Sequence, residues 1–167
     1  MEYNKKDYNP ELHDKYICLS LPQPQADRLT IPTFQDDEGF YQADQTIIFR
    51  TRNTKYRGEI LICASAKPVL NGHISGCTCG LVELYDIKPV EELTEKEWVE
   101  TCIEFSKRPR KGYAYFVKNP RRVVEMPIKG KLGMYEIVLT KDEICEYPTT
   151  LAIDQKGIDI INKRLKK

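Results

Sequence analysis

An α+β fold with a small β-barrel of about five to seven mostly antiparallel strands and flanking helices is predicted from three observations. At least five short segments are rich in β-branched and aromatic residues, as strands are. A few helical segments lie among them without regular alternation of strand and helix. The 167-residue chain is 41% hydrophobic and 31% charged, which is typical of one globular domain with a substantial core.

The strands are expected in one domain over 15–167, behind a flexible N-terminal arm. Residues 1–14 form this arm because they are polar and lack periodicity. An insertion near 31–44 contains Pro32 and an Asp-Asp-Glu-Gly turn, so we expect a loop or hairpin there. The expected strands are 16–21, 46–51, 59–64, 77–86, 113–117 and 135–139, with a turn at 53–58.

Two helices are expected in the second half of the chain. Thr94 followed by Glu97 is the spacing of a capping box, so a helix should begin there. The residues expected to share its apolar face are Trp98, Cys102 and Phe105. A C-terminal helix is expected over 153–165, where apolar residues recur near one helical face.

The sequence favours a cytoplasmic protein without metal or cofactor. It has no apolar run suited to a secretory signal or a membrane span, and four of its six cysteines lie in apolar surroundings. Cys77 and Cys79, with His73 before them, lack the paired C-x-x-C spacing of zinc sites. The glycine-rich loops of nucleoside triphosphate and dinucleotide sites are absent as well.

Charge is unevenly distributed along a chain whose formal net charge is +1. This neutrality excludes a protein that coats nucleic acid indiscriminately. Residues 106–131 contain nine basic residues and one acid, whereas 83–104 contain eight acids and two lysines. The basic region suggests a phosphate-binding face, and the acidic stretch 83–104 suggests a protein partner as a further interpretation.

A smaller basic group surrounds the expected turn at 53–58. Arg50 and Arg52 should project to the same side of an extended segment, where two guanidinium groups can grip phosphate oxygens. Lys55, Tyr56 and Arg57 follow. A second nucleic-acid signal, at 111–117, is weaker, because this segment matches only the first positions of an RNA-recognition motif. We therefore expect a turn glycine here, followed by a strand whose aromatic residues pack inward.

Several motifs in order resemble the ASCH domain family of the PUA-like superfamily. The main one is Gln45–Gly58 followed by Ile60–Ser65, and the supporting ones are Ser20–Pro24, Gly80–Leu84, Asn119–Arg122 and Pro127–Gly133. This resemblance implies a small β-barrel with a cleft beside its first strands. It also implies RNA or nucleotide-like ligands, and a few members are amidohydrolases of acylated cytidine or ribonucleases.

Two departures from the family pattern favour binding over catalysis. The family motif G-x-K-x-x-[E/T]-x-R has Lys where this chain has Gln45, and an acid or Thr where it has Ile48. Neither replacement can transfer a proton. We therefore expect RNA or a modified nucleoside or nucleotide as partner, bound by Thr46, Arg50, Arg52, Lys55, Tyr56, Arg57, Ser65, Lys118, Arg121, Lys129 and Lys131. The alternative is a hydrolase, a nucleoside amidohydrolase or ribonuclease, that uses a displaced site of Lys55, Tyr56 and Ser65.

Overall fold

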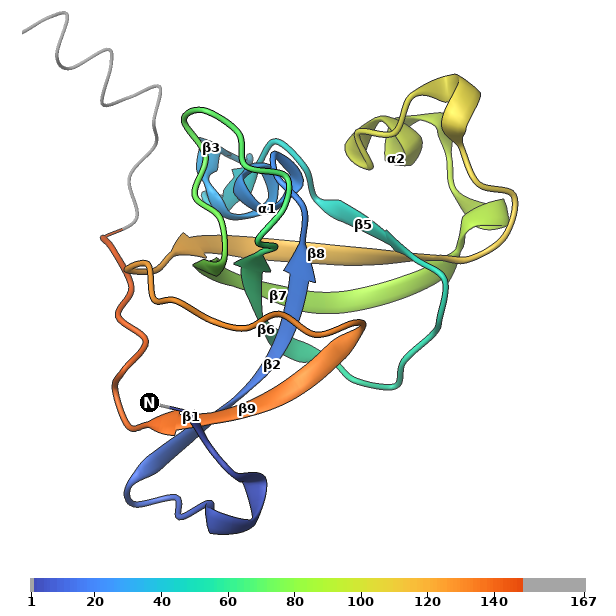
Figure 1. Cartoon of the computed structure of the whole chain (residues 1–167). Coiled ribbons are helices and arrows are strands. Elements are labelled where there is room, and N and C mark those ends of the chain that lie inside the picture. The colour runs from blue at the N-terminus through green and yellow to red at the C-terminus, as the bar shows by residue number, and fades with distance from the viewer. Residues whose placement is uncertain (1, 149–167) are drawn as a thin grey trace, which may run out of the picture.

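A seven-stranded mixed sheet, a separate two-stranded hairpin and two short α-helices make up the computed structural model, which describes residues 2–148 (Figure 1). The α+β class is therefore confirmed. The strands are β1 (Glu2–Tyr3), β2 (His13–Leu21), β3 (Pro32–Gln35), β4 (Tyr41–Ala43), β5 (Ile47–Arg50), β6 (Gly58–Ala64), β7 (Cys77–Pro89), β8 (Tyr113–Arg122) and β9 (Met134–Thr140). The helices are α1 (Gln25–Thr30) and α2 (Glu95–Glu100), with 3-10 turns at Lys5–Asp7, Val90–Glu92 and Phe105–Lys107.

The large sheet has the strand order β1-β9-β2-β6-β7-β8-β5. Its strand pairs are antiparallel except for β2 and β6, which are parallel. In Figure 1, β2 and β9 run across the direction of β7 and β8, so the sheet is strongly curved. Within residues 2–148 the edge strands β1 and β5 do not pair with each other, and no closed barrel is found.

The N-terminal residues differ from the sequence prediction, and the predicted C-terminal helix cannot be compared with the structure. Residues 2–14 do not form a loose arm, because β1 pairs with β9 and β2 already begins at His13. The His13 ring is buried beside Tyr3, with ring centroids 4.4 Å apart, and its Nδ1 accepts a hydrogen bond from the Asn9 amide at 3.0 Å. The C-terminal helix expected over 153–165 lies outside the described residues.

The segment 51–57 is not a turn between neighbouring strands, as its sequence had suggested. β5 pairs with β8 at the sheet edge, whereas β6 lies between β2 and β7. The connection must therefore carry the chain from the edge of the sheet to its centre, as Figure 1 shows. The expected insertion near 31–44 forms the hairpin β3–β4, which makes a sheet of its own.

Alternating side chains of the sheet fill two large apolar clusters, as the period of a strand requires, and Ile47, Ala114 and Phe116 form a minor third. The larger cluster includes Leu19 and Leu21 of β2, together with Leu29 of α1. The smaller one contains Cys18 and Cys63, which behave as small buried apolar residues. On β8, Tyr115 and Phe116 pack inward after Gly112, as expected for a strand that is not an RNA-recognition motif.

The helix α2 begins as predicted but ends early. The Thr94 side chain accepts from the Glu97 amide and Glu97 reaches back to the Thr94 amide, so the capping box is present. The helix has only six residues, because Cys102 adopts a left-handed backbone with φ of 59°. Phe105 consequently lies outside the helix and is 78% exposed, and the expected apolar face is not formed.

A buried carboxylate joins α1 to the sheet and to the loop before β7. Asp27 accepts from Arg122 of β8 at 2.9 Å, and its other oxygen lies 2.6 Å from His73 Nδ1. Burial by itself would raise the pKa of Asp27, but contacts with His73, Gln23 and Arg122 outweigh this effect and hold the pKa below its ordinary value. The ionised form of Asp27 therefore stabilises the fold.

Replacing Asp27 with Asn should lower the free energy of unfolding by about 3 kcal/mol near neutral pH, because it leaves the Arg122 charge without its partner. Since the pKa of Asp27 is lower in the folded state, its contribution is present above the ordinary Asp pKa of about 3.9 and is lost as the pH falls through the folded value. Urea denaturation across this range measures both effects.

The exposed Asp37, in the turn between β3 and β4, provides the matched control. Asp37→Asn should change the unfolding free energy by less than about 0.5 kcal/mol at any of these pH values. A gap between Asp27→Asn and the original protein that stays constant down to about pH 3 would contradict the stabilising role of the ionised carboxylate.

Candidate functional site

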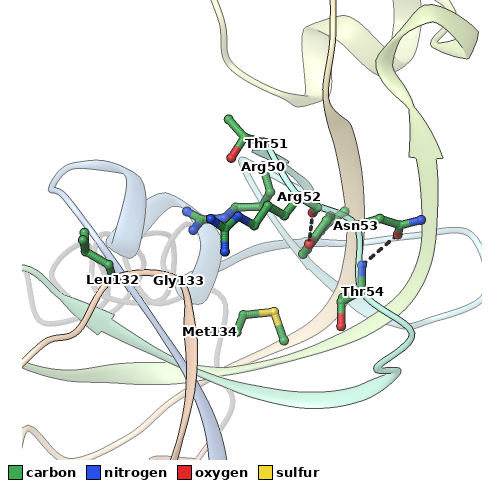
Figure 2. A pocket seen from close by; sticks show the side chains of 9 residues that line it. Arg50, Thr51, Arg52, Asn53, Thr54, Leu132, Gly133 and Met134 are labelled. Carbon is green, nitrogen blue, oxygen red and sulfur yellow. Dashed lines mark hydrogen bonds between the residues drawn. The ribbon is translucent and has the colours of Figure 1, made fainter.

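An open cleft lies between the loop that follows β5 and the turn that precedes β9 (Figure 2). Its volume of about 510 Å³ is within the range of roughly 300–1,000 Å³ that small-ligand sites occupy. We call it the arginine cleft. It is lined by Arg50, Thr51, Arg52, Asn53, Thr54, Tyr115, Leu132, Gly133 and Met134.

Hydrogen bonds fix the loop that forms one wall of the arginine cleft. The Tyr115 hydroxyl donates to the Arg52 carbonyl, and Asn53 Oδ1 accepts from the Thr54 amide at 2.8 Å. Burial raises the pKa of Tyr115, and the nearby Arg50 and Arg57 offset only part of that effect. The tyrosine thus stays a neutral donor near pH 7 and ties the loop after β5 to the first part of β8.

The opposite wall of the cleft is a turn that needs glycine. Gly133 has a φ of +69°, a conformation that side chains rarely adopt, and it leads directly into β9. Leu132 before it is fully exposed, and Met134 after it is partly buried against the larger core cluster. This wall therefore offers apolar atoms opposite the arginine residues.

Arg50 and Arg52 give the cleft its positive charge. Figure 2 shows both side chains pointing the same way, into the cavity that they line. Neither guanidinium group forms a hydrogen bond or an ion pair with another residue in the described part of the chain. Among the described residues the lining includes no carboxylate, so an anion entering the cleft meets two charges that these residues do not neutralise.

The other members of the first basic group do not enter the arginine cleft. Tyr56 packs against the larger core cluster and donates its hydroxyl to the Glu59 carbonyl at 2.6 Å, and it does not line the arginine cleft. The Arg57 guanidinium donates to the carbonyls of Thr54 and Tyr56, at 3.1 and 2.8 Å. Lys55 is exposed and lies outside the cleft lining.

The second basic group is largely engaged elsewhere. Arg121 forms ion pairs with Glu59 at 2.6 Å and with Glu146 at 3.4 Å. Lys118 lies over the ring of Tyr85, 5.0 Å from its centroid. Both residues therefore make contacts within the protein, and neither lines the arginine cleft.

Lys129 and Lys131 are the members of that group closest in sequence to the cleft. Both are exposed and belong to the segment that leads to Leu132. Lys131 approaches Glu2 at 4.0 Å and lies 5.7 Å from the centroid of the Tyr135 ring. Neither lysine lines the cavity itself, so they can contribute only to the potential around its entrance.

Thr46 and Ser65 lie away from the arginine cleft, in contrast to the prediction. The main chain of Thr46 bonds to Glu100 and Val117 at the opposite end of β5 from Arg50. Ser65 follows the last residue of β6, whereas Tyr56 precedes the first. A seven-residue strand spans roughly 20 Å, so the alternative hydrolase site of Lys55, Tyr56 and Ser65 is not assembled.

The two positions at which the chain departs from the family motif are both in the interior. Gln45 is 2% exposed, and its amide donates to the Ile47 carbonyl at 2.9 Å. Ile48 is fully buried in the larger core cluster. Neither side chain is among the residues that line the arginine cleft.

The sequence prediction identified two of the nine lining residues, Arg50 and Arg52. The others that it missed are Thr51, Asn53, Thr54, Tyr115, Leu132, Gly133 and Met134. A signal for some of them was present, because the Pro127–Gly133 motif carried part of the family resemblance. The prediction assigned binding to Lys129 and Lys131 of this motif, whereas its Leu132 and Gly133 line the cleft.

Other kinds of site find little support in residues 2–148. These residues contain no group of three or more His, Cys, Asp or Glu side chains that could hold a metal ion. Cys77 and Cys79 are buried, and His73 is bonded to Asp27. No helix in this described range is long and apolar enough to cross a membrane.

The comparisons with known proteins add no relative. No protein-family model matches the chain, and the search of curated proteins found no match. The ASCH resemblance therefore remains an expectation carried by the quoted residues, and the geometry of the arginine cleft is the main guide to function.

Replacing Tyr115 with Phe should loosen the wall of the arginine cleft. It removes the hydrogen bond to the Arg52 carbonyl while leaving the buried ring in place, at a cost of about 1 kcal/mol. The midpoint of thermal unfolding should fall by roughly 2–4 °C for a chain of this size. Tyr85→Phe is the control, because the hydroxyl of the exposed Tyr85 bonds to no described residue; equal shifts for both variants would contradict the assignment.

Proposed function

We propose that the chain is an RNA- or nucleotide-binding module that holds phosphate in the arginine cleft and does not catalyse a reaction. One observation carries this proposal: Arg50 and Arg52 project into an open cavity whose lining has no acid. A guanidinium group matches the geometry of phosphate and forms charge-assisted hydrogen bonds with it. Arginine residues without a partner at an exposed cavity are therefore best explained by an anionic ligand.

The contrast with other arginines strengthens this interpretation. Arg108 is held by Glu95 at 3.0 Å, and Arg122 by Asp27 at 2.9 Å. These residues neutralise carboxylates and maintain the fold. Arg50 and Arg52 lack such a role among the described residues, so their charge is available to a ligand.

A PUA-like barrel of the ASCH type is the finer fold that we propose. The curved sheet, the cleft between the loop after β5 and the turn before β9, and the order of the quoted motifs are consistent with it. The cytoplasm, where RNA and nucleotides are abundant, is the compartment that we propose.

The lining of the arginine cleft favours binding over catalysis. It contains no His, Cys, Lys, Asp or Glu that could act as nucleophile or general base near neutral pH. The Tyr115 hydroxyl is already committed to the Arg52 carbonyl. Gln45 and Ile48, at the positions where the family motif has Lys and an acid or Thr, are both buried.

The variants Arg50→Ala and Arg52→Ala should each weaken binding of a short, 5′-phosphorylated single-stranded RNA by roughly tenfold, because each removes a charge-assisted hydrogen bond to phosphate. The slope of log affinity against log salt should also become shallower, by about 0.7 for each phosphate that the variant no longer neutralises. Fluorescence anisotropy with labelled RNA over a range of salt concentrations measures both effects.

Arg28→Ala is the matched control, since Arg28 is an exposed arginine that lines a different cavity, beside Asp27 and His73. It removes the same charge and should leave the affinity within about twofold of the original value. Unchanged RNA affinity in the Arg50 and Arg52 variants, or equal losses in all three, would contradict the proposed site.

A further inference from the structure

The polar side chains of the arginine cleft present mainly hydrogen-bond donors. Arg50 and Arg52 offer only donors, five N–H groups on each guanidinium. Asn53 Oδ1 already accepts from the Thr54 amide at 2.8 Å, which leaves the Asn53 NH₂ group as a further donor. A ligand that satisfies this cleft must therefore supply several acceptors close together.

The charge of the cleft is matched by a doubly charged anion. Two guanidinium groups line it and no carboxylate opposes them. A phosphomonoester carries a charge of roughly −1.5 to −2 near pH 7 and has three terminal oxygens. An internal phosphodiester carries about one negative charge and has two such oxygens, so it leaves one guanidinium charge uncompensated.

We propose that the arginine cleft selects a terminal phosphomonoester, at the end of an RNA strand or on a free nucleotide, over the internal phosphodiesters of a chain. This inference rests on the proposed function and names the part of the ligand that the cleft recognises. It makes the module a reader of phosphate ends, for which the length and sequence of the RNA matter little.

The wall opposite the arginines gives the ligand a second contact. Leu132 is fully exposed at the rim, and Met134 lies beside it in the lining. Thioether and aliphatic groups pack well against the flat face of a base or sugar. A nucleotide should consequently bind more tightly than inorganic phosphate, which contacts the guanidinium groups alone.

The change in the charge of the ligand with pH provides a test, because the described lining of the cleft has no His, Cys, Lys, Asp or Glu. The lining side chains with charge or acidity are Arg50, Arg52 and Tyr115, and burial raises the pKa of Tyr115 further above neutrality. Arg57, from the same loop, acts on the pKa of Tyr115 together with Arg50 and lowers it in part. A phosphomonoester loses its second charge as the pH falls below about 6, whereas a phosphodiester keeps its single charge.

The experiment compares three short single-stranded RNAs of one sequence with an internal fluorophore: one with a 5′-phosphate, one with a 3′-phosphate and one with hydroxyl groups at both ends. Anisotropy near pH 7.5 should show roughly tenfold tighter binding of at least one phosphorylated RNA. This advantage should disappear near pH 5. Uridine monophosphate should compete better than inorganic phosphate, and Arg28→Ala should behave like the original protein.

The possible outcomes separate this inference from the proposed function. If all three RNAs bind equally and the Arg50 and Arg52 variants weaken all of them, the cleft binds RNA but the selection of a terminal phosphate is refuted. If no RNA and no nucleotide binds, both proposals fail. A phosphate preference that survives Arg50→Ala and Arg52→Ala places the recognition elsewhere on the molecule and also overturns the inference.

Discussion

Pairing of β5 with β8, and not with β6, is the constraint on which the arginine cleft depends. Ile47–Arg50 lies along β8 at the edge of the sheet, so the chain must cross to the centre of the sheet before β6 begins. Residues 51–57 make this crossing and carry Arg52 with them. Gly112 permits the close contact between the two strands, since a Cβ there would lie 2.3 Å from the Phe49 ring. Without this edge pairing the two arginines would flank an ordinary hairpin turn.

Pairing of charges explains why the formal count in a stretch of sequence is a poor guide to a binding surface. The excess of basic residues over 106–131 is real, but Arg108, Arg121 and Arg122 each contact a carboxylate. Their partners come from other segments: Glu95, Glu59 and Asp27. Such pairs contribute little field outside the protein because the opposite charges lie within a few ångströms. The arginine cleft has fewer charges, but within residues 2–148 no carboxylate in its lining neutralises them.

Local features of this fold could be predicted from the sequence, and long-range pairing could not. The β-branched run of 59–64 and the spacing of Thr94 and Glu97 act within a few residues, so a strand and a helix start were found close to their positions. The partner of β5 depends on residues more than sixty positions away, and no local signal specifies it. The same holds for the cleft: Arg50 and Arg52 were recognised, whereas Tyr115 and Met134 join them only through the tertiary fold.

The interior position of Gln45 separates this residue from the arginine cleft. The side-chain amide of Gln45 bonds to the Ile47 carbonyl and its main-chain amide to the Arg28 carbonyl, so it links the start of β5 to α1. A lysine at this position would bring an ammonium group into a buried region. Because burial removes water from the charge, this would carry a high desolvation cost. Gln45 thus supports the strand that ends in Arg50, and the arginine cleft lies at the other end of β5.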